Sequence, residues 1–178
     1  MYDEVLRFWF DEIEPKQRWI KNEQLDQLIV ARFSELYTQA IHCELFEWRK
    51  TATGRLAEII VLDQFSRNMF RESALCFAND TLALALSQEA IALGVDKSLT
   101  PIQRSFLYMP FMHSESLTIH EIAVGLFQKN GIKANLDFEI KHKKIIEQFG
   151  RYPHRNKILG RVSTDKELKY LQQPGSGF

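Results

Sequence analysis

This chain has no excess of positive or of negative charge. Its 178 residues include 23 Lys and Arg and 23 Asp and Glu, so the formal net charge is zero. Proteins that bind nucleic acids or anionic membrane surfaces usually carry a basic excess. We therefore expect no nucleic-acid partner and no membrane partner, and any site for an anion must be local.

Long apolar runs and paired cysteines are also missing. Runs such as Ile59–Leu62 are far too short to span a bilayer. The two cysteines, Cys43 and Cys76, are distant in sequence and form no CxxC pair, which is typical of reduced structural thiols in a cytosolic protein. The segment Met1–Val5 carries acids where a secretion signal would carry Lys or Arg. These features predict a cytoplasmic protein.

The alternation of apolar and polar residues that marks β-strands is absent as well, and no linker or low-complexity segment divides the chain. Apolar residues instead recur at steps of three and four, the period of amphipathic helices. A length of 178 residues with 45% hydrophobic content allows a substantial core. We predict an all-α fold, a single helical domain over residues 1–178 with about seven or eight helices packed as antiparallel hairpins.

Capping residues and prolines predict where these helices begin and end. We expect Asn22 and Asp80 to be N-caps, and Pro110 to end or kink its helix. The expected helices are residues 2–11, a stretch that contains Leu25 to Ala40, about Thr53 to Asn68, Asp80 to Gly94, a helix opened by Thr100-Pro101, Ser114 or Ser116 to Phe127, about Ala134 to Phe149, and a short last helix opened by a capping box of Thr164 and Glu167. The tail from Gln173 is not expected to be helical.

The first polar motif lies at the end of the third expected helix. On a helical wheel, Asp63 and Arg67 share a narrow face with Ile59 and Ile60, so Asp63 continues an apolar stripe. We expect Asp63 to be buried and paired with a charge, with Arg67 as its nearest partner in sequence. Two interpretations remain open. The pair is a structural ion pair, or it joins Gln64 and neighbouring donors around a pocket.

The second polar motif follows the seventh expected helix. His142 stands in the middle of an apolar stripe that runs from Phe138 to Phe149. The turn between Gly150 and Gly160 then concentrates positive charge with no acid. Its charged and amide residues, with the arginine that follows, are Arg151, His154, Arg155, Asn156, Lys157 and Arg161. Such a loop is suited to bind an anion. The alternative is that these residues clamp helix ends or pair with Asp63 and Glu115.

The third motif, Phe106–Glu115, places polar groups after a proline at the start of another helix. It contributes Tyr108, His113 and Glu115. The side chains of His113, Glu115, His142 and His154 are of types that ligate metals, but their spacing is irregular. No HExxH motif occurs, and neither does a nucleophile elbow, a Walker loop or a dinucleotide-binding glycine motif. We expect no metal and no cofactor.

Five segments of the chain are similar to a known family. They are Val5–Phe10, Leu62–Asn68, Phe106–Glu115, Phe149–Asn156 and Pro174–Phe178. Together they resemble the bacterial domain-of-unknown-function family 924, and the resemblance spans essentially the whole chain.

The chain departs from the pattern of this family at two places: Ser66 stands where proline is expected and Ile20 where an aromatic residue is expected. Neither difference removes a charged candidate. The resemblance implies a helical fold similar to tetratricopeptide-repeat proteins and implies no activity. The sequence itself shows no clean 34-residue repeat.

The leading hypothesis is a polar pocket for a small anionic metabolite, with acid–base catalysis by histidine and carboxylate. The residues expected to be catalytic are Asp63, His113 and His154. The residues expected to bind the ligand are Gln64, Arg67, Tyr108, Glu115, His142, Arg151, Arg155 and Arg161. The alternatives are a helical scaffold that binds a protein partner in a groove, and a polar set that is purely structural.

Overall fold

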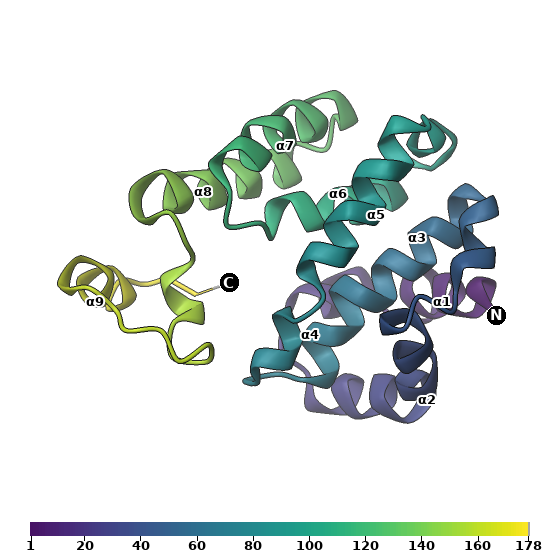
Figure 1. Cartoon of the computed structure of the whole chain (residues 1–178), viewed down its shortest axis with the longest axis horizontal. Helices are drawn as coiled ribbons and strands as arrows, with labels where there is room; N and C mark the ends of the chain where they lie inside the picture. The colour runs from purple at the N-terminus through teal and green to yellow at the C-terminus, as the bar shows by residue number, and fades with distance from the viewer. Residues whose placement is uncertain (178) are drawn as a thin grey trace.

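Helices form nearly all the regular structure of the protein. The computed structural model describes residues 1–177, and no strand occurs in that range (Figure 1). The α-helices are α1 (Tyr2–Arg7), α2 (Glu23–Ile41), α3 (Ala52–Ile60), α4 (Ser66–Met69), α5 (Asp80–Ala92), α6 (Pro101–Met112), α7 (Leu117–Asn130), α8 (Lys133–Phe149) and α9 (Asp165–Leu171). The all-α prediction is confirmed. Phe178, which belongs to the predicted domain and tail, lies outside the described residues.

Shorter helical turns connect these elements. Two are π turns, η1 (Phe8–Glu12) and η4 (Val61–Phe65). The others are 3-10 turns, namely η2 (Pro15–Trp19), η3 (Phe46–Lys50), η5 (Ala74–Phe77), η6 (Val95–Ser98) and η7 (Pro153–Arg155).

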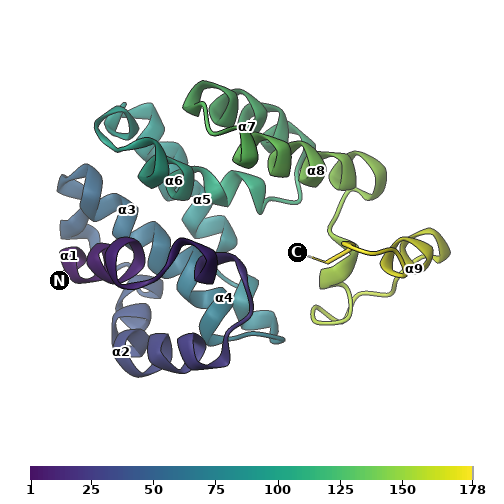
Figure 2. The same cartoon turned by 180° about the vertical axis from the view of Figure 1, so that it is seen from behind.

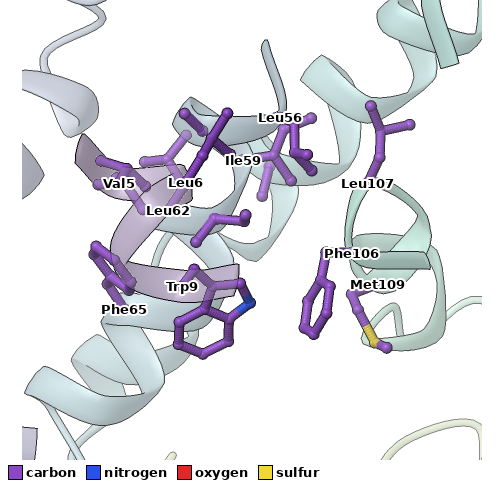
Figure 3. Packing of buried hydrophobic residues seen from close by; sticks show 14 of the residues in the cluster. Val5, Leu6, Trp9, Leu56, Ile59, Leu62, Phe65, Phe106, Leu107 and Met109 are labelled. Carbon is purple, nitrogen blue, oxygen red and sulfur yellow. The ribbon is translucent and has the colours of Figure 1, made fainter. Parts of the chain in front are cut away.

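The rod formed by α3, η4 and α4 passes through the centre of the main core. Leu56, Ile59, Leu62 and Phe65 are fully buried, and Figure 3 shows them beside Trp9 of the N-terminal segment. This confirms the expectation that the third helix, apolar almost all round, is central. Side chains from α1, α2, α5, α6 and α7 also belong to the main cluster.

The rod begins where the sequence predicts a boundary. Thr51 caps α3 by accepting a hydrogen bond from the amide of Gly54. A Cβ atom at Gly54 would lie only 2.1 Å from the carbonyl oxygen of Trp48, so glycine allows η3 to pack closely against the first turn of α3.

Consecutive helices pack on one another in the second half of the chain, α5 on α6, α6 on α7 and α7 on α8 (Figure 1). This arrangement agrees with the predicted helical hairpins. The likeness to tetratricopeptide repeats and the extent of the domain remain predictions. No described helix is long and apolar enough to cross a membrane.

Two local expectations differ from the structure. Asp80 is the first residue of α5 rather than its N-cap, because its carboxylate is bound by Arg67 and Arg155. Pro110 does not end α6, which continues to Met112 because its second half is buried in the core. The alternative, that Pro110 kinks the helix, stays a prediction.

The C-terminal segment, residues 151–177, stands beside the helical body (Figures 1 and 2). A small apolar cluster, separate from the main cluster, joins this segment to α8. It consists of Ile145, Ile146 and Tyr152, against which Phe149 and Tyr170 pack. The described polar contacts of this segment with the body gather around one place.

Candidate functional site

Asp63 and His113 form the centre of that place. Asp63 lies in the π turn η4 and is fully buried, as predicted, while His113 lies at the C-cap of α6. The Nδ1 atom of His113 is 2.7 Å from Oδ1 of Asp63, and Gln64 donates from Nε2 to Oδ2 at 2.6 Å. π turns occur often at functional sites, so the backbone at Asp63 supports a site there.

Arg67 supplies the charge that keeps Asp63 ionised. Its Nη1 atom donates to the backbone carbonyl of Asp63 at 2.7 Å and lies 3.3 Å from Oδ1. Burial by itself would raise the pKa of Asp63, but the interactions with His113, Arg67 and Gln64 outweigh it and hold that pKa below its ordinary value. The predicted charge pairing of Asp63 is therefore confirmed.

The surroundings of His113 favour its neutral imidazole over the charged form. Burial lowers the pKa of His113, and the nearby Arg67 cation lowers it further, against the opposing effect of Asp63. The side chain of His113 is nevertheless 16% exposed to solvent. Among the described residues, no hydrogen bond reaches its Nε2 atom.

Asp80 links the first motif to the C-terminal segment. Arg67 binds its carboxylate at 2.9 and 3.0 Å, and Arg155 donates to the same carboxylate from Nη1 at 3.2 Å. Arg155 also donates from Nη2 to the carbonyl of His113 at 3.0 Å. Sequence analysis missed Asp80 in this role because it treated the residue as a helix cap. The only signal for a further acid was the unbalanced positive charge of the second motif.

A second polar cluster surrounds the buried Tyr152. The hydroxyl of Tyr152 donates to the carbonyl of Met112 at 2.6 Å and lies 3.1 Å from Nε2 of His120. Nδ1 of His120 is 2.7 Å from Oε1 of Glu139, and both side chains are fully buried. Sequence analysis missed this pair, because His120 and Glu139 are 19 residues apart on different helices.

His142 and His154 flank the same tyrosine, with ring centres 5.7 and 5.5 Å from that of Tyr152. Burial lowers the pKa of His142 to about 3. Burial, with a contribution from Arg155, lowers the pKa of His154 to about 4. Both rings are therefore neutral at physiological pH.

The other predicted residues divide into those near the centre and those elsewhere. Glu115 accepts from the amide of Tyr152 at 2.7 Å and pairs with Arg161 at 2.6 Å, at the edge of the cluster. Tyr108 donates its hydroxyl to Asp96 instead, and Arg151 pairs with Glu167 inside the C-terminal segment. The described contacts do not bring Tyr108 or Arg151 to the Asp63–His113 pair.

The three motifs therefore converge, as expected, through Asp63, His113 and Arg155. His113, Glu115, His142 and His154 were weighed as metal ligands in the sequence. Within residues 1–177, no group of three or more His, Cys, Asp or Glu side chains is placed to hold a metal ion.

Fold and site together define an all-helical protein with a buried carboxylate–imidazole pair where three sequence motifs meet. A family model described as "Bacterial protein of unknown function (DUF924)" matches residues 5–175, and the chain belongs to this family. The chain is also similar to the solved structure of ATU0120, a protein of unknown function from Agrobacterium tumefaciens. The TM-score is 0.91 and the sequence identity 36%, with 96% of each chain covered. A comparison with curated proteins found no match.

Proposed function

We propose that this protein is an enzyme in which His113 acts as a general base and Asp63 orients it. The observation that carries the proposal is the short bond between Nδ1 of His113 and Asp63, beside an imidazole that keeps part of its exposure. An ionised Asp63 accepts the Nδ1 proton, which leaves a lone pair on Nε2. The lowered pKa of His113 favours this neutral form at physiological pH.

The substrate that we propose is a small metabolite in the cytoplasm, with a hydroxyl, water or acidic C–H group whose proton His113 removes. Fewer observations support an anionic substrate than support a general base. Arg67 and Arg155 already have Asp63 and Asp80 as partners, so an anion would have to compete with these carboxylates. A single carboxylate or phosphate group near Arg155 remains the first class to test.

A second candidate function is the binding of a protein segment. An open hollow of about 390 Å³ lies between α2 and α4, where Val30, Ala31 and Met69 provide apolar surface beside the Asp26–Arg71 ion pair. A hollow between helices favours an extended or helical peptide. It involves neither Asp63 nor His113, so variants separate the two functions.

A screen of activated esters, phosphate esters and sugar phosphates tests the enzyme proposal. His113→Asn is expected to lower kcat by about 10²-fold or more, the usual contribution of a general base. The control is His42→Asn, the same substitution at an exposed histidine on the far end of α2. Full activity in a folded His113→Asn protein would contradict the proposal.

A chemical probe tests the same histidine without a substrate. Diethyl pyrocarbonate modifies neutral, accessible imidazoles, and peptide mapping identifies each modified residue. We expect His113 to react at pH 7, as the exposed His42 does, and the fully buried His120 to be protected. An inert His113 alongside a fully modified His42 would show a sealed Nε2 and would favour a purely structural cluster.

A further inference from the structure

The C-terminal segment meets the helical body next to the proposed base. Tyr152 bonds to the carbonyl of Met112 through its hydroxyl and to Glu115 through its amide. Arg155 bonds to the carbonyl of His113, and Arg161 pairs with Glu115. These partners on the body side lie within the four residues 112–115, which contain the base itself.

Two aromatic rings hold the Arg155 side chain in place, in addition to its hydrogen bonds. Its side chain is 8% exposed, and its guanidinium lies 4.4 Å from the ring centre of Phe77 and 4.6 Å from that of Tyr152. One ring belongs to the body and the other to the C-terminal segment. A guanidinium between two aromatic faces is fixed in orientation, because the cation interacts favourably with both ring faces.

Two routes lead from this guanidinium to the imidazole. Nη2 fixes the backbone of His113 directly. Nη1 binds Asp80, which also binds Arg67, and Arg67 contacts both the carbonyl and the carboxylate of Asp63. The main-chain position of His113 and the carboxylate that orients its ring therefore both depend on one side chain from the C-terminal segment.

We infer that Arg155 is a positioning residue and that the C-terminal segment, residues 151–177, forms part of the active site by docking Arg155 against His113 and Asp80. The inference rests on the proposed function of His113, and it extends that function to a part of the chain that contacts no reacting atom. When Arg155 is not docked against His113 and Asp80, the His113 imidazole becomes more exposed to solvent and loses its fixed orientation.

The test is the titration of the His113 imidazole by NMR in Arg155→Gln, which needs no substrate. We expect the pKa of His113 to rise toward its ordinary value, because burial is the largest cause that lowers it. Modification of His113 by diethyl pyrocarbonate should become several-fold faster. Phe77→Leu, which removes one of the two stacked rings and no hydrogen bond, should shift both readouts in the same direction by less.

The matched control is Arg151→Gln, the same substitution four residues earlier in the same segment. Arg151 pairs with Glu167 inside the segment, at 2.7 and 2.9 Å. The Arg151→Gln substitution therefore weakens contacts within the segment and removes no bond to His113. The inference is overturned when Arg155→Gln leaves the titration and reactivity of His113 at wild-type values, or when Arg151→Gln shifts them equally. Neither result depends on catalysis, so a failure of the proposed function, seen as an active His113→Asn protein, remains a separate outcome.

Discussion

Replacing Asp63 with alanine is the perturbation whose cost follows most directly from the contacts. The carboxylate is fully buried and accepts bonds from His113 and Gln64, at 2.7 and 2.6 Å. Its removal leaves both donors without their acceptor, at a cost of about 1–3 kcal/mol each. Arg67 also loses one of its two carboxylate partners, although Asp80 remains. We therefore expect Asp63→Ala to lower the free energy of unfolding by about 3–5 kcal/mol.

Thermal and urea denaturation, followed by circular dichroism at pH 7, measure this loss. In a chain of this size each kcal/mol lowers Tm by about 2–4 °C, so a decrease of roughly 10 °C is expected. The control is Asp137→Ala, the same substitution at an exposed aspartate whose 2.7 Å pair with Lys133 is worth only about 0.3–0.5 kcal/mol. The reasoning is refuted by an Asp63→Ala protein that melts with the wild type, or by an equal loss in Asp137→Ala.

Two further predictions concern protons in the cluster. The pKa values of His142 and His154, about 3 and 4 in the folded protein, lie below the ordinary value of 6.5. The unfolded chain therefore binds more protons below pH 6.5, and urea melts should show stability falling from pH 6.5 toward 4, by about 1.4 kcal/mol per pH unit for each histidine. His142→Gln should reduce this slope, and a flat profile above pH 4.5 would contradict the prediction. Glu139→Gln should change the free energy of unfolding by less than about 1 kcal/mol, whereas breaking a buried ion pair costs about 3–5. A large loss in the same melts would show that Glu139 is ionised.

The expectation for Glu139 follows from the hydrogen bonds around His120. Nε2 of His120 faces two acceptors, the carbonyl of Ser114 at 2.8 Å and the hydroxyl oxygen of Tyr152, which itself donates to Met112. Nε2 therefore carries a proton, and the contact between Nδ1 and Glu139 needs another. Burial raises the pKa of Glu139, and its Oε2 atom has no hydrogen-bond partner among the described residues. A protonated carboxyl that donates to Nδ1 satisfies both conditions, and a glutamine amide can take its place.

The sequence predicts the helices and the centre of the candidate site because both follow from local periodicity. Asp63 on an apolar face implies burial, and buried polar groups are satisfied most readily by one another, which brings His113 to Asp63. Arg155 joins the cluster through His113 and Asp80. Partners set by tertiary packing could not be predicted. The pairing of His120 with Glu139 depends on how α7 lies against α8, and the choice of Asp96 by Tyr108 depends on where η6 turns.

The same limit explains the arginines of the second motif. Their excess positive charge is plain in the sequence and indicates an anion. The counter-charges are supplied from other parts of the chain, Asp80 for Arg155, Glu115 for Arg161 and Glu167 for Arg151. The sequence analysis named Glu115 as a possible partner, and the pair of Glu115 with Arg161 agrees with it. No local pattern identifies Asp80 or Glu167, because each stands at or near the start of a different helix.

The π turn at Val61–Phe65 makes the spacing of residues as important as their identity. Hydrogen bonds that run from residue i to i+5 hold one residue more than an α-helical turn does. Deleting a single residue there would restore an uninterrupted α-helix, and α4 would keep nearly its present orientation because the π turn accommodates its extra residue locally. The change would fall on the backbone of η4 itself, where Asp63 lies. The extra residue therefore bears on the placement of the Asp63 carboxylate more than on the helix that carries Arg67.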